Sequence, residues 1–292
     1  MYTQFFGNFL LSKGYITNEQ LFDALKEKAQ KHAKLGTLAI HSGLMTAAEV
    51  DSVIVEQTHQ DKKFGELTIE MGYLTDEQVK ELLSIQSPDF LLLGQILLDK
   101  GIIDNTTLEK SIHDYRNENA ISDLDMVLED KDSINHLIGH FFANTGIDPS
   151  AIDIMYLELL FNSFIRFVGD DYTPLSAEIC DSFSADCMVR QDIKGSYAIS
   201  TYIGMSQTTA INFASRYVNE SFSVYDEYVQ ASLDDFLNLN NGLFLVNCSN
   251  DQALELTLTA PEHFDGQTRS FNKACKLKLL YPFGAIHFII EF

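Results

Sequence analysis

The fold of the first part of the chain is decided by a stretch that occurs twice, as KLGTLAIHSGLM at residues 34–45 and as KFGELTIEMGYL at residues 63–74. The two copies lie 29 residues apart, and each contains two glycines seven residues apart. The same spacing extends in both directions and gives four copies over residues 1–118: Gly7 and Gly14, Gly36 and Gly43, Gly65 and Gly72, Gly94 and Gly101. A constant period of this length is typical of repeat proteins.

Each copy predicts a short helix, a glycine stop and a longer helix with a capped start. Thr46 is followed three residues later by Glu49, which forms a capping box in which both side chains bind free amides at the helix start. The matching positions of the other copies hold Thr17 with Gln20, Thr75 with Gln78, and Asp104. The second glycine of each pair is expected to end the short helix in a left-handed conformation.

The longer helices carry apolar residues four positions apart, which predicts one buried stripe in each copy. A single copy is too small to cover such a stripe, so we expect neighbouring copies to stack on one another. The stripe positions are Leu21 and Leu25, Val50 and Ile54, Val79 and Leu83, and Leu108 and Ile112. Residues 1–118 are therefore assigned to an all-α module.

The residues around each glycine pair carry a family resemblance. The pattern runs from Lys34-Leu35-Gly36 to Gln57 and from Lys63-Phe64-Gly65 to Gln86. It resembles the MshEN-type N-terminal domain of type II secretion and type IV pilus assembly ATPases. Members of that family can bind cyclic di-GMP, and the resemblance implies that the ligand would contact Lys34, Leu35, Gly36, Lys63, Phe64 and Gly65.

The sequence departs from this family just before Leu-Gly, where arginine is typical. Lys34 and Lys63 stand there in the middle copies, and the first arginine of the chain is Arg116. Arginine binds phosphate through a planar, bidentate group, whereas lysine offers only a point charge. The departure favours a helical scaffold or docking module over a nucleotide sensor, and both interpretations stay open.

The composition predicts a soluble protein that avoids polyanions. The net charge is −22, no apolar run reaches the length of a membrane helix, and the N-terminus lacks a signal-peptide pattern. Such an acidic surface repels phosphate backbones and anionic lipids, so we expect a protein partner and neither nucleic acid nor membrane. The four cysteines lie far apart, which predicts reduced, buried thiols and a cytoplasmic location.

Residues 119–150 are predicted to connect the two parts of the chain. A charge-rich stretch precedes an apolar helical pattern, which predicts a connecting helix, and Gly146 and Pro149 follow it. Asp132, His136 and His140 would share one face of that helix. Three groups without a fourth ligand make a weak metal site, so no metal is expected.

Residues 151–292 predict an α+β domain with helices packed on a mainly antiparallel sheet. Helical patterns cover residues 152–168, 207–218 and 225–244. Strand patterns cover residues 179–189, 196–203, 254–258, 274–280 and 286–292. Pro282, Phe283 and Gly284 separate the last two strands, which predicts a terminal hairpin.

The helix predicted over residues 225–244 has two distinct faces. At 100° per residue one face carries Asn240 and the large apolar residues Val229, Leu233, Phe236, Leu237 and Phe244. Asp235 and Asn238 lie on the opposite face, with only Ala231 and Gly242 beside them. A carboxamide can orient a water molecule, and a carboxylate can pair with a lysine of a closely approaching protein. The geometry alone favours the alternative, an ordinary solvated helix face.

The residues that carry a second resemblance lie between Tyr197 and Asn247, and they are Gly204-Met205-Ser206, Ala210, Ala214 and Asp235-x-x-Asn238-x-x-x-Gly242. They are similar to the CheX/CheC family of chemotaxis phosphatases, with one candidate motif over residues 150–292, as in CheX. The resemblance implies docking on a phosphorylated response-regulator receiver, with Asn238 positioning the water that attacks the aspartyl phosphate and Asp235 gripping a receiver lysine. It also implies a homodimer, no cofactor bound by this chain, and Mg²⁺ on the partner receiver.

Asp235 stands where this family uses glutamate, which shortens the reach of the carboxylate by about 1.5 Å. An active phosphatase, a weakened one and a domain that only binds receivers all stay open. The leading hypothesis is a two-component or chemotaxis-type protein that hydrolyses a receiver's aspartyl phosphate and uses the repeats as a sensory or docking module. The alternative is a non-enzymatic signalling adaptor or a protein that responds to cyclic di-GMP.

Overall fold

The chain divides into two compact units, residues 2–128 and residues 129–292. The computed structural model describes residues 2–27, 32–84, 89–118, 138–139, 142 and 145–292. Within these ranges, no helix is both long enough and apolar enough to cross a membrane. Asp132, His136 and His140 of the predicted connecting helix lie outside the described residues. The domain boundaries drawn at residues 118 and 151 stay predictions.

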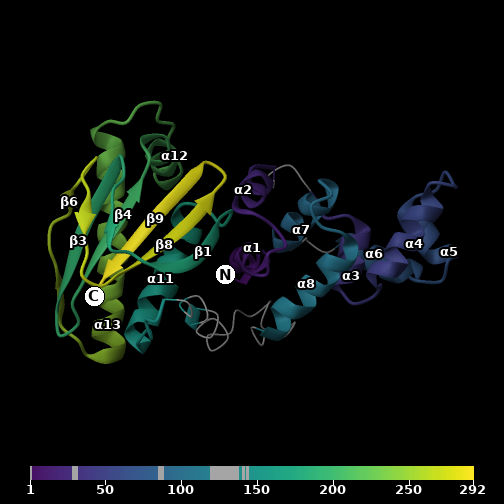
Figure 1. Cartoon of the computed structure of the whole chain (residues 1–292), viewed down its shortest axis with the longest axis horizontal. Helices are drawn as coiled ribbons and strands as arrows, with labels where there is room; N and C mark the ends of the chain where they lie inside the picture. Colours follow the sequence, from purple (N-terminus) through teal and green to yellow (C-terminus); the bar gives the residue numbers. More distant parts are fainter. Residues whose placement is uncertain (1, 28–31, 85–88, 119–137, 140–141, 143–144) are drawn as a thin grey trace. The chain divides into compact units, whose positions relative to one another are not determined.

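The first unit follows the predicted alternation of short and long helices (Figure 1). In the described ranges its helices are α1 (Tyr2–Ser12), α2 (Asn18–Glu27), α3 (Leu35–His41), α4 (Ala47–Gln57), α5 (Phe64–Glu70), α6 (Asp76–Ser84), α7 (Asp89–Asp99) and α8 (Asn105–Glu118). Each odd-numbered helix and the helix after it form one repeat. The prediction of an all-α first part is confirmed.

Helix ends in this unit show the predicted chemistry. The Glu49 amide donates to Thr46 Oγ1 at 3.3 Å, and the Thr46 amide donates to the Glu49 carboxylate at 2.7 Å. Equivalent bonds form at Thr17 with Gln20, at Thr75 with Gln78, and at Asp104 with Thr107. The stop glycines all have the left-handed backbone that other residues rarely adopt: Gly14 (φ 72°), Gly43 (66°), Gly72 (76°) and Gly101 (63°).

The first glycine of the later pairs has a packing role. A Cβ atom at Gly36 would lie 3.0 Å from the Val50 side chain, and one at Gly94 would lie 2.8 Å from Leu108. Gly65 makes the equivalent approach in the third repeat. The long helix of each of these repeats thus rests on the backbone of its own short helix, which only glycine allows at this distance.

The repeats do not follow a simple sequential stack. The second and third repeats are neighbours, because α4 packs on α5 and α3 packs on α6. The first repeat instead packs against the fourth, through α1 on α7 and α8 and through α2 on α7. An aromatic cluster fills this contact: Phe6, Phe9, Phe90 and Tyr115. The expectation that each copy stacks on the next is wrong in this respect.

Two positions that the sequence predicts as core are exposed in this unit. Ile54 is 45% exposed and Leu83 is 66% exposed, whereas their counterparts Leu25 and Ile112 are buried. Ile54 and Leu83 line a pocket of this unit instead. The four copies are therefore equivalent in sequence but not in burial.

The second unit is an antiparallel sheet with three packed helices in the described ranges, α11 (Ala151–Phe167), α12 (Gln207–Tyr217) and α13 (Glu227–Gln252) (Figure 1). The main sheet has the order β1-β8-β9-β4-β3-β5, with β6 also paired to β3. Its strands are β1 (Thr173–Ile179), β3 (Cys187–Gly195), β4 (Ile199–Met205), β5 (Leu256–Leu258), β6 (Glu262–His263), β8 (Ala274–Tyr281) and β9 (Gly284–Glu291). Strands β2 (Ser182–Phe183) and β7 (Arg269–Ser270) form a separate pair. The predicted α+β class is confirmed.

Strand register decides which side chains face the helices. Gln191 of β3 pairs with Thr201 of β4, and Thr201 pairs with Ile290 of β9, so these three side chains share one face of the sheet. Helix α13 packs on β3 at this face. The neighbouring Arg190 and Tyr202 point to the opposite face, because side chains alternate along a strand.

Several element boundaries differ from the prediction. The predicted strand over residues 179–189 is wrong as a unit, because it spans the end of β1, all of β2 and the start of β3. Helix α13 continues past residue 244 to Gln252. The terminal hairpin is confirmed, with Tyr281 paired to Gly284 across the turn.

The cysteines are free and buried, as predicted: Cys180, Cys187, Cys248 and Cys275. Burial raises the pKa of the Cys187 thiol to about 11 and that of the Cys275 thiol to about 12. Both groups are therefore protonated at neutral pH, and neither has the reactivity of a thiolate.

Candidate functional site

Helix α13 places the predicted site residues on its open face. The Asp226 side chain caps the helix by accepting from the amides of Tyr228 and Val229. The predicted inner face is buried, with Phe236 and Asn240 fully covered. Asp235 and Asn238 are exposed on the outer face. The structure thus brings both residues together one helical turn apart, as the sequence predicts.

Asp235 is held by a hydroxyl group. The Tyr217 hydroxyl at the end of α12 donates to Asp235 Oδ2 at 2.6 Å. The Tyr217 ring packs edge-on against Phe236. Burial, followed by the hydrogen bond to Asp235, raises the pKa of Tyr217 above its ordinary value. Asp235 is therefore an oriented carboxylate, and any lysine that pairs with it shares it with a neutral phenol.

Asn238 is held by a hydrogen bond from strand β3 of the sheet. Gln191 Nε2 on β3 donates to Asn238 Oδ1 at 2.8 Å. The same Nε2 donates to the main-chain carbonyl of Thr259 at 2.9 Å. Gln191 is only 1% exposed, so an exposed carboxamide on the helix is tied to a buried one on the strand.

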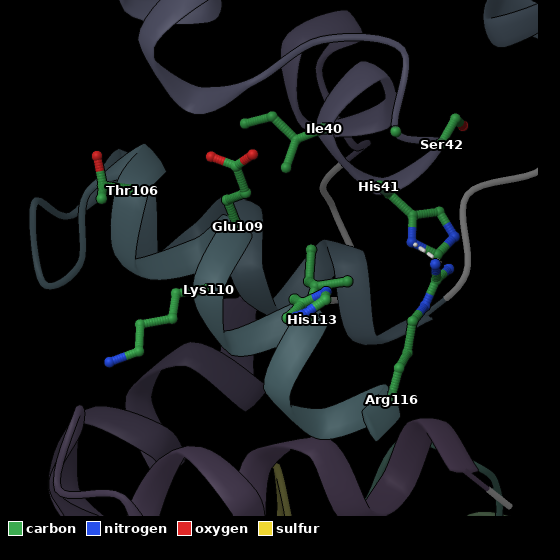
Figure 2. A pocket seen from close by; sticks show the side chains of 10 residues that line it. Ile40, His41, Ser42, Thr106, Glu109, Lys110, His113 and Arg116 are labelled. Atoms are coloured by element: carbon green, nitrogen blue, oxygen red, sulfur yellow. Dashed lines mark hydrogen bonds between the residues drawn. The ribbon is translucent and has the colours of Figure 1, made fainter. Parts of the chain in front are cut away.

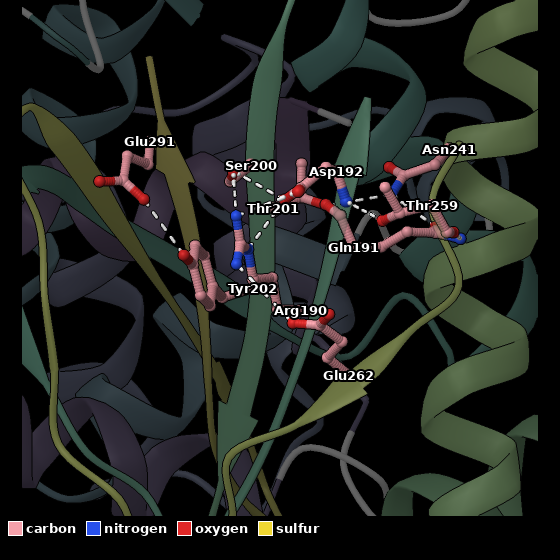
Figure 3. Close-up of polar contacts among 10 residues, drawn as sticks. All are labelled: Arg190, Gln191, Asp192, Ser200, Thr201, Tyr202, Asn241, Thr259, Glu262 and Glu291. Atoms are coloured by element: carbon pink, nitrogen blue, oxygen red, sulfur yellow. Dashed lines mark hydrogen bonds and ion pairs between the residues drawn. The ribbon is translucent and has the colours of Figure 1, made fainter. Parts of the chain in front are cut away.

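Gln191 belongs to a buried polar network between the sheet and the helices (Figure 3). Asn241 Nδ2 donates to Gln191 Oε1 at 2.9 Å and to Thr201 Oγ1 at 3.0 Å. The Tyr156 hydroxyl on α11 donates to Asn241 Oδ1 at 2.7 Å. Buried polar groups are costly unless they are paired, so this network strongly favours one arrangement of its side chains.

The outer face of α13 is more apolar than the sequence suggested. Tyr228 is 65% exposed and Val246 is 55% exposed. Both lie within about 20° of Asp235 around the helix axis. The prediction of only small neighbours was wrong, because it left out Tyr228 and ended the helix at residue 244, before Val246. Exposed apolar side chains therefore lie before and after the polar pair on this face of the helix.

Sequence reasoning missed the two residues that hold the site, Gln191 and Tyr217. Neither belongs to the motif on α13, and each is brought there by strand register or helix packing. Gln191 carried one usable signal, since it stands between Val189 and Ile193 on the side of a strand that should be apolar. A polar residue at such a position indicates a specific buried partner.

The predicted nucleotide residues are only partly brought together. Lys34, Leu35 and Gly36 line a pocket of about 800 Å³ together with Phe64, whereas Lys63 and Gly65 do not line it. Lys34 Nζ lies 2.7 Å from Asp99 Oδ1. Asp51 and Asp104 also line the pocket, so its lining has three acidic residues. Three acidic residues beside one lysine create an environment unfavourable to a ligand with two phosphates.

Lys63 and Gly65 contact neighbouring residues of the fold at the start of α5. The Lys63 amide donates to Glu66 Oε2 at 2.9 Å at the start of α5. A Cβ atom at Gly65 would approach Leu35 and Val79 at 3.2 Å. Both residues therefore serve the start and the packing of a short helix.

A second pocket in the same unit, of about 810 Å³, carries basic side chains that sequence reasoning did not single out (Figure 2). Lys110, His113 and Arg116 recur every third residue on α8 and line it with His41. Arg116 Nη2 lies 3.1 Å from His41 Nδ1. The three-residue spacing was the signal for a shared helix face.

No protein-family model matches the sequence, and no curated protein matches it significantly. Solved structures with a similar fold cover about half of the chain. The chemotaxis protein CheX from Desulfovibrio desulfuricans is 13% identical, with 48% of this chain and 98% of that chain covered and a TM-score of 0.42. A CheC-like superfamily protein from Shewanella sp. PV-4 is 15% identical, with coverages of 47% and 93% and a TM-score of 0.41.

A chain of the CheX–CheY–BeF₃–Mg²⁺ complex from Borrelia burgdorferi is 18% identical to this protein. The alignment covers 47% of this chain and 94% of that chain, with a TM-score of 0.37. These low sequence identities and TM-scores do not allow residue roles to be transferred from the solved structures to this protein. Any role assigned to a site residue must therefore be argued from the geometry described above.

Proposed function

We propose that the second unit docks through α13 on a phosphorylated response-regulator receiver and hydrolyses its aspartyl phosphate. One observation carries the proposal: Asp235 and Asn238 are both exposed one turn apart on a helix face, and the buried Gln191 holds Asn238 in one orientation. Side chains on an ordinary solvated face need no such support. Groups that act on a partner benefit from being oriented before it arrives.

The proposed reaction is an in-line displacement at phosphorus. Asn238 holds a water molecule, whose oxygen attacks the phosphorus while the bond to the receiver's aspartate oxygen breaks. Both protons of the water leave with the phosphate, so the products are dihydrogen phosphate and the ionised aspartate of the receiver. Asp235 pairs with a receiver lysine and fixes the approach, and the receiver brings its own Mg²⁺, which neutralises charge on the phosphoryl oxygens.

The exposed apolar residues support docking at this face. Tyr228 and Val246 flank the polar pair along the helix, so a partner that covers Asn238 also covers them. Gly242 has no side chain, and no other atom lies within 4 Å of the position that a Cβ atom would take there. A partner can therefore approach the helix backbone next to Asn238.

The test is phosphate release from CheY-type receivers that have been phosphorylated with acetyl phosphate in the presence of Mg²⁺. Full-length protein should release phosphate faster than the receiver alone, and Asn238→Ala should lower the added rate by about a hundredfold. Binding to a receiver activated with beryllium trifluoride should persist in this variant, because docking uses the rest of the face. Equal rates for the two proteins would eliminate the catalytic role.

The rival function, a non-enzymatic adaptor, predicts a different outcome of the same assay. An adaptor would bind the activated receiver and leave its phosphate lifetime unchanged, with or without Asn238. A homodimer through the second unit is compatible with both functions and is a separate question for sedimentation analysis.

Cyclic di-GMP sensing by the repeats gains no support from the surroundings of Lys34, where Asp51, Asp99 and Asp104 gather. Calorimetric titration of the full chain with cyclic di-GMP should therefore give no binding heat at high micromolar ligand. Saturable heat that disappears in Lys34→Ala would restore this function.

A further inference from the structure

We infer that Gln191 is the positioning residue that turns the Asn238 amide group outward as a hydrogen-bond donor, an inference that rests on the proposed phosphatase function. Gln191 is a buried residue on β3, and it contacts Asn238 through a single hydrogen bond of 2.8 Å. The inference gives the two ends of the Asn238 carboxamide different tasks.

The orientation of Gln191 follows from a carbonyl group. The Thr259 main-chain oxygen can only accept, so the end of Gln191 that faces it at 2.9 Å must be the Nε2 amide. That same Nε2 faces Asn238. The opposite end, Oε1, accepts from Asn241 Nδ2.

The orientation of Asn241 is fixed in turn by its own partners. Thr201 Oγ1 gives its proton to the Gln191 main-chain carbonyl at 2.9 Å and therefore accepts from Asn241 Nδ2. Asn241 Oδ1 accepts from the Tyr156 hydroxyl. Reversing any one amide would place two donors or two acceptors against each other inside the fold.

The orientation of the Asn238 amide follows from that of Gln191. Because Gln191 offers a donor, the buried side of the Asn238 carboxamide is its oxygen, and the exposed side is its NH₂ group. Toward a receiver, Asn238 therefore presents N–H donors. One of them can bind the oxygen of the attacking water and leave its other lone pair for phosphorus, which is the role that the proposed reaction requires.

The decisive variants change the two ends separately. Asn238→Asp keeps an oxygen for Gln191 but removes the outward donors, and we expect its rate to fall to that of Asn238→Ala. Gln191→Met keeps the side-chain volume and removes the donor, and we expect kcat to fall at least tenfold with KM for the phosphorylated receiver unchanged. A merely structural residue would not separate these two constants.

A matched control comes from the opposite face of the sheet. Tyr202→Phe removes a hydrogen bond of 3.1 Å to Glu291 on strands of the same sheet, without contact to the network. It should leave kcat within twofold of the wild-type value. An Asn238→Asp variant with wild-type activity, or equal losses of kcat in Gln191→Met and Tyr202→Phe, would overturn the inference.

A second measurement separates this inference from the proposed function and does not require activity. The side-chain ¹⁵NH₂ resonance of Asn238, assigned by its loss in Asn238→Ala, should have the order parameter of a fixed group in the wild type. It should become mobile in Gln191→Met. If the wild type released no phosphate but this change occurred, the proposed function would fail while the positioning of Asn238 would stand. An equally ordered resonance in both proteins would refute the positioning.

Discussion

At the scale of single residues, Asp235 already has a hydrogen-bond partner within its own unit. The Tyr217 hydroxyl donates to its carboxylate at 2.6 Å. A hydrogen bond to a charged group contributes about 1.5–3 kcal/mol, so under the proposed docking a receiver lysine would compete with it or share the second oxygen. The shorter side chain of aspartate makes this competition more important than it would be for glutamate.

This competition predicts that Tyr217→Phe binds a receiver activated with beryllium trifluoride and Mg²⁺ more tightly, by about threefold to tenfold. The substitution frees the Asp235 carboxylate and keeps the ring on Phe236. Fluorescence anisotropy with a labelled receiver measures the affinity. In an Asp235→Asn background the same substitution should change nothing, and weaker binding of Tyr217→Phe alone would contradict the prediction.

His287 gives the fold a pH dependence. It lies on β9, with Lys276 and Lys278 on β8 and Glu178 on β1 among the charged groups that act on it, and its pKa is lowered to about 4, chiefly by burial. The unfolded chain therefore binds a proton at a higher pH than the folded chain does. The contribution of neutral His287 is fully present above about pH 6.5 and is lost as the pH falls toward 4.

His287→Leu should therefore flatten the stability profile between pH 6.5 and pH 4. We expect the wild type to lose about 2 kcal/mol more than the variant over this range, after allowance for the partial exposure of the ring. Urea unfolding at a series of pH values measures the difference. Parallel profiles would contradict it.

At the scale of elements, glycines in two helices have opposite roles. Gly94 lies in α7, where a Cβ atom would come within 2.8 Å of Leu108, whereas Gly242 lies in α13 with open space around it. Gly94→Ala should destabilise the protein by about 1–3 kcal/mol through overpacking, although alanine favours the helix. Gly242→Ala should stabilise it by about 0.5–1 kcal/mol.

Chemical unfolding of both variants provides the measurement, and each is the control for the other, since the chemical change is the same. If both alanines stabilised the protein, the close approach of α7 and α8 would be refuted.

The elements also show where prediction from sequence succeeds and where it fails. Capping boxes and stop glycines depend on residues a few positions apart, so Thr46 and Gly43 define their helix ends from sequence alone. Strand β1 was missed because Pro174 disfavours an inner strand, and the structure places β1 at the sheet edge, where proline is tolerated. The two-residue strands β2 and β7 are too short to give any pattern.

Some residues of the candidate site could also be predicted from the sequence, and others could not. Asp235 and Asn238 could be predicted, because one helix sets their spacing. Gln191 and Tyr217 could not, since strand register and helix packing bring them to α13. Ile54 and Leu83 looked like core residues, but their burial depended on which repeats become neighbours, and local periodicity does not contain that information.

At the scale of the molecule, the contact between the first and fourth repeats predicts unequal effects of truncation. Residues 1–118 should unfold cooperatively with high helical content. Residues 1–86 lack α7 and α8, which leaves Phe6 and Phe9 without Phe90 and Tyr115, so this fragment should lose cooperative unfolding. Residues 32–118 keep the paired middle repeats and the α4–α8 contact, and should retain more helix per residue.

Thermal unfolding followed by circular dichroism compares the three fragments. Equal cooperativity of residues 1–86 and residues 32–118 would mean that the first repeat does not depend on the fourth.

The contact between the first and last repeats also has a consequence for synthesis on the ribosome. The partners of α1 are α7 and α8, so Phe6 emerges from the exit tunnel long before Tyr115 has been translated. Contacts between such distant segments form slowly, and the apolar side of α1 stays uncovered during that interval. Helix α1 therefore depends for the burial of its apolar side on segments that are translated about ninety residues later.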